Sequence, residues 1–350
     1  MILESPPKSG GLFLLHYFKQ NEVLMIEAEK SYRRVMMKIG IAMIVFLIVF
    51  FALSLLWSFF YLYIRTTKPP REAYIISQLV YAAVYAISFA VPAGILYLTT
   101  RNEKKERLSR FSFPLIAPCY IMTAIVAGLS FSYLNQAIVG FFDFGSLPNI
   151  TYPSLHSEYE IWIELLVTAL MPGIFEELLF RGAILSNLLP YGKAPAILIS
   201  SVLFGLMHQN PAQFLYTTMA GIILAWIAVE TRSLLCSMVA HFANNAYSVF
   251  QMSAAANLDK NYANMLFFWI ELAVFALGIA GALLLIFSYY KKKKRVDFSG
   301  GMFEKELAFE EKYLMPIEAS RMFKISFPAT VIIFVVLAGA SSMIIPLISI

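Results

Sequence analysis

Long apolar runs alternate with short polar stretches along most of the chain. A helix needs about 20 apolar residues to cross a bilayer, and the pattern predicts about nine such segments. They lie near residues 37–64, 73–99, 112–133, 159–180, 194–211, 213–230, 233–252, 263–290 and 325–349. Pro211, in the polar turn between the fifth and sixth segments, predicts a tight helical hairpin there. The predicted fold is all-α and polytopic, with about eight core helices and a ninth after them.

The same pattern divides the chain into six regions, and the three polar motifs described below fall in one of them. The regions are a cytoplasmic or interfacial segment (1–36), amino-terminal transmembrane helices (37–155), the core with the polar motifs (156–255), an eighth helix (256–290), a polar amphipathic linker (291–324) and a carboxy-terminal transmembrane helix (325–350).

Composition supports a membrane protein. The 350 residues are 59% hydrophobic and only 14% charged, and the mean hydropathy is +0.71, which is far too apolar for a soluble domain. The two cysteines, Cys119 and Cys236, lie in apolar segments without metal-binding spacing. Neither a disulfide framework nor a cysteine zinc site is therefore predicted.

Lysine and arginine collect at one set of segment ends, and short loops rich in them are expected to be cytoplasmic. The clusters are Arg33, Arg34 and Lys38; Arg101, Lys104, Lys105, Arg107 and Arg110; and Lys291 to Arg295. If each predicted segment crosses the membrane once, all three clusters fall on one side of the membrane. The loop 135–158, which has no lysine or arginine, then falls on the other side. The loop with Arg65, Lys68 and Arg71 disagrees. The prediction is a multi-pass cell membrane protein with its amino terminus in the cytoplasm and its carboxyl terminus outside.

Two glutamates and an arginine interrupt the apolar segment 159–180 and its continuation. Ionisable groups at membrane depth are costly, so they indicate a functional site. Glu177 and Arg181 are four residues apart on one helical face and are expected to form an ion pair. Glu176 is turned about 100° away and lacks that partner, so it is the candidate general base. Met171-Pro172-Gly173, just upstream, is expected to interrupt the helix. The alternative is a purely structural ion pair, with Glu176 merely solvated.

Two further polar sites follow on the next apolar segments. His208 comes four residues after Phe204, which places the two rings on one helical face. His241 and Asn245 share a face in the same way, and Asn244 is adjacent. Two such donors side by side suit a developing oxyanion. Each site alone fits a hydrogen-bonded core residue as well, and only their conjunction on neighbouring segments favours a site that activates water against a carbonyl.

The three motifs together resemble those of the CAAX protease and bacteriocin-processing enzyme family, and their wording resembles its prokaryotic branch. The matching phrases are Phe175 to Gly182 (FEELLFRG), Phe204 to His208 (FGLMH) and His241 to Asn245 (HFANN). The resemblance covers about residues 155–255. It implies a helical core of about eight spans that encloses a hydrophilic cavity, and an intramembrane glutamic peptidase without an obligatory metal.

Carried over to this chain, the resemblance implies a role for each motif residue. Glu176 would be the general base, and His208 would help to hold the water. His241 and Asn245 would stabilise the oxyanion, Glu177 and Arg181 would form the structural pair, and Phe204 would support the site. The implied partners are the lipid bilayer and a peptide or membrane-protein substrate.

Other classes of protein fit the same residues. Glu176, His208 and His241 could form a zinc site, but the chain lacks HExxH, so no cofactor is predicted and zinc is disfavoured. A non-catalytic scaffold or immunity protein could bind a peptide in the same cavity, and a transporter could use these groups as a proton relay. Nucleic acid is not an expected partner, because the basic clusters flank apolar segments rather than exposed aromatic residues.

Overall fold

The computed structural model describes residues 9–101, 108, 111–141 and 157–298, and in this part the chain forms helices and no strand. The all-α prediction is therefore confirmed for the described residues. The helices are α1 (Ser9–Thr67), α2 (Pro70–Thr100), α3 (Ala117–Phe141), α4 (Glu158–Glu164), η2 (Leu165–Leu170), α5 (Met171–Glu177), η3 (Leu178–Leu185), α6 (Ser186–Leu188), η4 (Leu189–Tyr191), α7 (Lys193–Met207), α8 (Pro211–Thr231), α9 (Leu234–Asn257) and α10 (Lys260–Phe298). The predicted ninth segment, 325–349, and the linker beyond Phe298 lie outside the described residues.

Four helices among the described residues are long and apolar enough to cross a membrane. These candidate spans are Glu27–Thr67, Pro70–Thr100, Ala212–Thr231 and Lys260–Ser288, and Ala117–Ser132 and Lys193–Met207 are shorter apolar helices. The chain is thus a helical membrane protein. Two other predicted segments do not reach the same length or apolarity: 159–180 is divided among several short helices, and α9 carries His241 and three asparagines.

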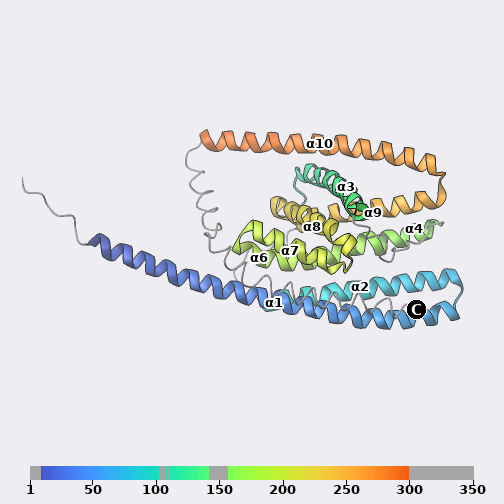
Figure 1. Cartoon of the computed structure of the whole chain (residues 1–350), viewed down its shortest axis with the longest axis horizontal. Helices are drawn as coiled ribbons and strands as arrows, with labels where there is room; N and C mark the ends of the chain where they lie inside the picture. The colour runs from blue at the N-terminus through green and yellow to red at the C-terminus, as the bar shows by residue number, and fades with distance from the viewer. Residues whose placement is uncertain (1–8, 102–107, 109–110, 142–156, 299–350) are drawn as a thin grey trace, which may run out of the picture.

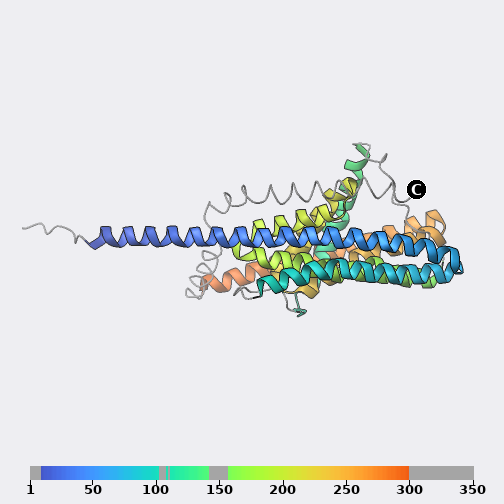
Figure 2. The same cartoon turned by 90° about the horizontal axis from the view of Figure 1, so that it is seen from below.

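The helices form three layers (Figure 1). An antiparallel hairpin of α1 and α2 lies on one side, α4 to α9 fill the middle, and α10 lies on the other side against α3. The amino-terminal part of α1 projects beyond the other described helices in both views (Figure 2). The middle layer, which carries all three motifs, is therefore covered on both sides.

The two outermost helices are longer than the apolar pattern predicts. α1 begins at Ser9, not near residue 37, and α10 continues to Phe298, through the lysine cluster assigned to the linker. Charged residues such as glutamate, lysine and arginine are good helix formers, and Glu29 pairs with Arg33 one turn later at 2.7 Å. The thickness of the membrane determines the length of the apolar stretch, whereas the helix can continue beyond it through charged residues.

The segment 158–191 stays helical through Met171-Pro172-Gly173, which corrects the predicted interruption. Two π-helical stretches, η2 and η3, flank α5 instead. A π turn shifts the backbone hydrogen bonds by one residue. Because proline has no amide hydrogen to donate, this shift can help a helix to continue through Pro172. Such turns also occur often at functional sites. The signature Glu176-Glu177 ends α5, directly before η3.

α7 and α8 form the predicted hairpin, with a break before Pro211. Two glycines allow the two helices to approach closely. A Cβ at Gly205 would lie 3.0 Å from the Phe214 carbonyl oxygen, and one at Gly221 would lie 3.1 Å from Ser201 Cα. Since both contacts are with the facing helix, side chains at these positions would push α7 and α8 apart.

Candidate active site

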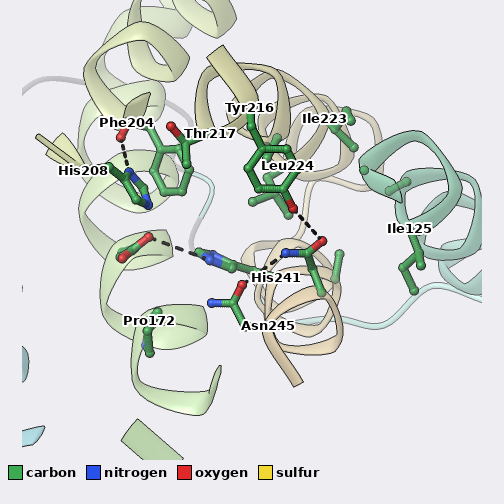
Figure 3. Close-up of a pocket in the computed structure, with 16 residues that line it drawn as sticks. Ile125, Pro172, Phe204, His208, Tyr216, Thr217, Ile223, Leu224, His241 and Asn245 are labelled. Atoms are coloured by element: carbon green, nitrogen blue, oxygen red, sulfur yellow. Dashed lines mark hydrogen bonds and ion pairs between the residues drawn. The ribbon is translucent and has the colours of Figure 1, made fainter. Parts of the chain in front are cut away.

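A cavity of about 210 Å³ lies between α5, α7, α8 and α9 of the middle layer and the neighbouring helix α3. Its polar lining includes Glu176, His208, His241, Asn244 and Asn245, whereas α3 and α8 contribute mainly small and aliphatic side chains. Figure 3 shows His208, His241 and Asn245 around one space, with Ile223 and Leu224 on the far side. The structure therefore brings the polar residues of all three motifs to one cavity with a polar and an apolar half.

Glu177 and Arg181 form the ion pair that their spacing predicts, and both are almost fully buried. Arg181 Nη1 donates to Glu177 Oε1 at 2.9 Å, and Nη2 donates to the Gly221 carbonyl oxygen of α8 at 3.0 Å. The guanidinium also lies over the Phe204 ring, 4.5 Å from its centroid, which is a cation–π contact. Arg181 therefore links the 158–191 segment to both helices of the α7–α8 hairpin.

Glu176 lies on the cavity side, 4% exposed, and Arg181 does not pair with it as it does with Glu177. It has partners that the sequence did not indicate. The Tyr85 hydroxyl of α2 donates to Oε1, and His241 Nε2 lies 3.8 Å from Oε2. Oε2 is buried and has no hydrogen-bond partner among the described residues. One oxygen of this carboxylate is thus held, and the other is free to bind a small polar group.

His241 lies between the two glutamates. Its Nδ1 is 2.9 Å from Glu177 Oε1, and its Nε2 faces Glu176. A carboxylate paired with arginine accepts hydrogen bonds and does not donate them, so Nδ1 carries the hydrogen of this bond. Glu177 therefore fixes the orientation of the imidazole and leaves Nε2 to face the cavity, as the carboxylate partner of a catalytic histidine does.

His208 is oriented by its own helix. Its Nδ1 lies 3.0 Å from the Phe204 carbonyl oxygen, an acceptor, which leaves Nε2 as the lone-pair side of the neutral ring. The rings of Phe204 and His208 are in contact on one helical face, as their spacing predicts, and meet edge to face with an interplanar angle of 69°. The Phe204 ring also contacts His241, with centroids 5.8 Å apart. Phe204 therefore packs against both histidines and against Arg181.

Asn244 and Asn245 both line the cavity and belong to one hydrogen-bonded chain. The Tyr216 hydroxyl donates to Asn244 Oδ1 at 3.1 Å, and Asn244 Nδ2 donates to Asn245 Oδ1 at 3.2 Å. Asn245 Nδ2 donates in turn to the Thr168 carbonyl oxygen at 3.2 Å. The α-helical partner of that carbonyl would be the amide of Pro172, which has no hydrogen. Asn245 thus satisfies a backbone group that the proline leaves open.

Sequence reasoning missed three polar residues near the site: Tyr85, Tyr216 and Glu164. Buried Glu164 accepts hydrogen bonds from Tyr74 and Gln78 of α2 and from the Thr168 hydroxyl. A signal was present on α2, because Tyr74, Gln78 and Tyr85 recur at spacings of four and seven residues, which is the period of one helical face.

No three His, Cys, Asp or Glu side chains are grouped as metal ligands in the part of the chain that the structure describes. His241 Nδ1 is occupied by Glu177, and Nε2 is the nitrogen that remains for other partners. Whether the protein uses a metal is a separate question, and the expectation that it needs none stays a prediction.

These features define a polytopic helical membrane protein with a buried site of glutamate, histidine and asparagine. Residues 158–247, from α4 to α9, match the family model described as "Type II CAAX prenyl endopeptidase Rce1-like". This part of the chain is therefore similar to that family, and the resemblance predicted from the three motifs is confirmed.

A related protein is consistent with the family match. "Putative membrane peptidase YdiL" of Bacillus subtilis is 27% identical over 171 residues, which cover 47% of this chain and 68% of that protein. No solved structure matches the chain significantly. α1, α2, α3 and α10 lie outside the region that the family model covers.

Proposed function

We propose that this protein is an intramembrane peptidase in which Glu176 activates a water molecule for attack on a peptide bond. The observation that carries the proposal is the buried Oε2 of Glu176, which has no hydrogen-bond partner among the described residues and belongs to a cavity that His208 and His241 also line. A carboxylate can accept a proton from a water held within hydrogen-bond distance. The family match and the related membrane protein named as a peptidase support the same class of reaction.

His208 is proposed to help hold the attacking water. Its Nδ1 hydrogen is directed to the Phe204 carbonyl oxygen, so Nε2 of the neutral ring can accept a hydrogen bond. A water that donates one hydrogen to Glu176 Oε2 and the other to His208 Nε2 keeps its lone pairs for the carbonyl carbon. Glu176 then takes the proton as the carbon–oxygen bond forms, and the leaving amine receives it when the peptide bond breaks.

His241 and Asn245 are proposed to stabilise the oxyanion. His241 Nε2 lies 3.8 Å from Glu176 Oε2 and faces the same cavity. An imidazolium carries a hydrogen on both ring nitrogens, so a protonated His241 would donate from Nε2 to the oxyanion while Nδ1 stays bonded to Glu177. The second hydrogen of Asn245 Nδ2 supplies another donor, since the first is directed to Thr168.

The substrate is proposed to be a peptide or membrane-protein segment that reaches the cavity from the bilayer. The apolar half of the cavity, formed by residues such as Ile125, Ile223 and Leu224, suits an uncharged side chain next to the cleaved bond. Because the matched family is named for CAAX prenyl endopeptidases, a prenylated peptide is the first probe to try, and the same peptide without its lipid is the matched comparison.

The protein is proposed to have its amino terminus in the cytoplasm. Lys38 Nζ donates to the Thr99 carbonyl oxygen at 2.8 Å, so the basic start of the α1 span lies beside the end of α2, where the second basic cluster begins. Ser31 and Tyr191 hydroxyls, 2.7 Å apart, bring Lys193 to the same end. Positive side chains thus gather at one end of the bundle, as at cytoplasmic membrane surfaces.

Cleavage by the purified protein in proteoliposomes tests the proposal. The probes are an internally quenched farnesylated peptide ending in Cys-aliphatic-aliphatic-X, its unprenylated counterpart and a single-span membrane peptide, with products identified by mass spectrometry. We expect a defined new carboxyl terminus from at least one probe. Absence of cleavage of all three would argue for a binding protein that uses the same cavity.

The two asparagines of the third motif are expected to differ in their effect on cleavage. Asn245→Ala removes an oxyanion donor and should lower kcat by about 10²–10³-fold with little change in KM. Asn244→Ala removes only a residue that orients Asn245, so its effect should be much smaller. Single-turnover kinetics on both variants, with thermal unfolding as a check on folding, measures the difference. If Asn244→Ala lost most of its cleavage rate while Asn245→Ala cleaved at nearly the wild-type rate, the oxyanion site would be assigned to the wrong residue.

Cleavage is expected to survive removal of metals. A glutamate that activates water directly needs no Lewis acid, so exhaustive chelation followed by gel filtration should leave the rate unchanged. The control is a metalloprotease treated in parallel, which should lose its activity. Complete loss in the present protein, with rescue by zinc and not by magnesium, would instead favour a zinc mechanism.

A further inference from the structure

The first transmembrane hairpin contributes directly to the site. α2 packs against α5 and η3 and lies outside the region matched by the family model. Its Tyr85 hydroxyl donates to Glu176 Oε1 across 91 positions of sequence. The candidate base is therefore held by a helix that the three motifs do not include.

The Tyr85 side chain is fixed by its neighbours. Its ring packs against Phe89, with centroids 4.7 Å apart, and against Tyr81 at 6.1 Å. Phe89 is buried and packs against Phe46 of α1 at 4.9 Å. The hydroxyl that reaches Glu176 therefore belongs to an aromatic stack that joins α1 and α2. Moving it would require the packed rings to shift as well, which costs free energy in a closely packed interior.

The bond to Tyr85 distinguishes the two oxygens of Glu176. Oε1 accepts from the tyrosine, whereas Oε2 lies near His241 Nε2 and has no hydrogen-bond partner among the described residues. A carboxylate held at one oxygen cannot rotate freely about its last side-chain bond. One oxygen is therefore directed to Tyr85, and the other is left for a partner in the cavity.

We propose that Tyr85 is a positioning residue for Glu176, which fixes the carboxylate so that Oε2 receives the proton of the attacking water. The inference rests on the proposed role of Glu176 as the base. Tyr85 itself does not line the cavity and exchanges no proton with the substrate. It acts by keeping the base in a productive orientation, and misplacement of a catalytic group by a small distance is costly for the rate.

Tyr85→Phe tests the proposal, because it removes the hydroxyl and keeps the aromatic stack. We expect kcat to fall about 10–100-fold, the range for loss of a hydrogen bond to a charged group, with KM and the unfolding temperature nearly unchanged. Tyr81→Phe is the matched control. It removes a hydroxyl one turn away on the same helix and leaves the bond between Tyr85 and Glu176 in place, so it should cleave normally.

A second readout does not depend on turnover. The carboxylate stretching band of Glu176, assigned by infrared difference spectra between wild type and Glu176→Gln, should shift in Tyr85→Phe and stay in place in Tyr81→Phe. An unshifted band, or wild-type kcat in Tyr85→Phe, would overturn the positioning role while leaving the proposed peptidase intact. Failure of the wild type itself to cleave any probe would instead overturn the proposed function, and the positioning role with it.

Discussion

Glu176→Gln is expected to abolish peptide cleavage while the protein folds and inserts into the membrane normally. The amide has nearly the same shape and can still accept the Tyr85 hydrogen bond at its oxygen, but it cannot accept a proton from water. Loss of the catalytic base should lower kcat by at least about 10²–10⁴-fold, the contribution typical of general base catalysis. The measurement is the cleavage rate in proteoliposomes at matched protein content.

Two controls make this result specific. Glu164→Gln alters a buried carboxylate of the same segment, outside the cavity, and should keep most of the activity. The thermal unfolding temperature of Glu176→Gln should match that of the wild type, because no ion pair with Arg181 is lost. Normal turnover by Glu176→Gln would exclude Glu176 as the base.

Arg181→Ala is expected to destabilise the whole protein, and loss of activity should follow from loss of structure. The substitution leaves Glu177 as a buried charge without its cation and removes the hydrogen bond to the Gly221 carbonyl oxygen. Breaking a buried ion pair by removing one partner costs about 3–5 kcal/mol. A lower unfolding temperature in detergent, with reduced yield of folded protein, is the expected measurement.

A surface ion pair provides the comparison for Arg181. Lys193 lies 3.7 Å from Glu230, with side chains 66% and 38% exposed. Exposed pairs of this kind contribute about 0–1 kcal/mol, so Lys193→Ala should unfold close to the wild-type temperature. If Arg181→Ala unfolded at the same temperature as Lys193→Ala, the buried pair would not have the structural importance that its geometry indicates.

The ion pair and the shared cavity could be predicted because helical periodicity is a local property. Glu177 and Arg181 are one turn apart, and that spacing brings them together in the structure despite the π turns nearby. The same rule placed His241 and Asn245 on one face of α9, and both line the cavity. Membrane burial made these residues conspicuous, since few ionisable groups occur in apolar segments.

Contacts between helices far apart in sequence could not be predicted in this way. Tyr85 meets Glu176 only because α2 packs against α5, and no spacing rule relates two separate helices. The orientation of His241 depends likewise on Glu177, 64 positions away. An apolar pattern shows which face of a helix is buried, but it does not show which neighbour covers that face.

Local backbone geometry was the other source of error. Met171-Pro172-Gly173 suggested a broken helix, because proline lacks an amide hydrogen. The segment instead remains helical through π turns, and Asn245 from α9 donates to the carbonyl of Thr168. Compensation by a side chain from another helix is a tertiary effect, so a single segment cannot reveal it.

Cleavage in water enriched with heavy oxygen tests the proposed peptidase most directly. Wild-type protein and Glu176→Gln, reconstituted side by side, are incubated with the quenched peptides, and the products are weighed by mass spectrometry. A peptidase that activates water through Glu176 should place one heavy oxygen in the new carboxyl terminus with the wild type and form no product with Glu176→Gln. Equal amounts of labelled product from both proteins, or none from either, would contradict it.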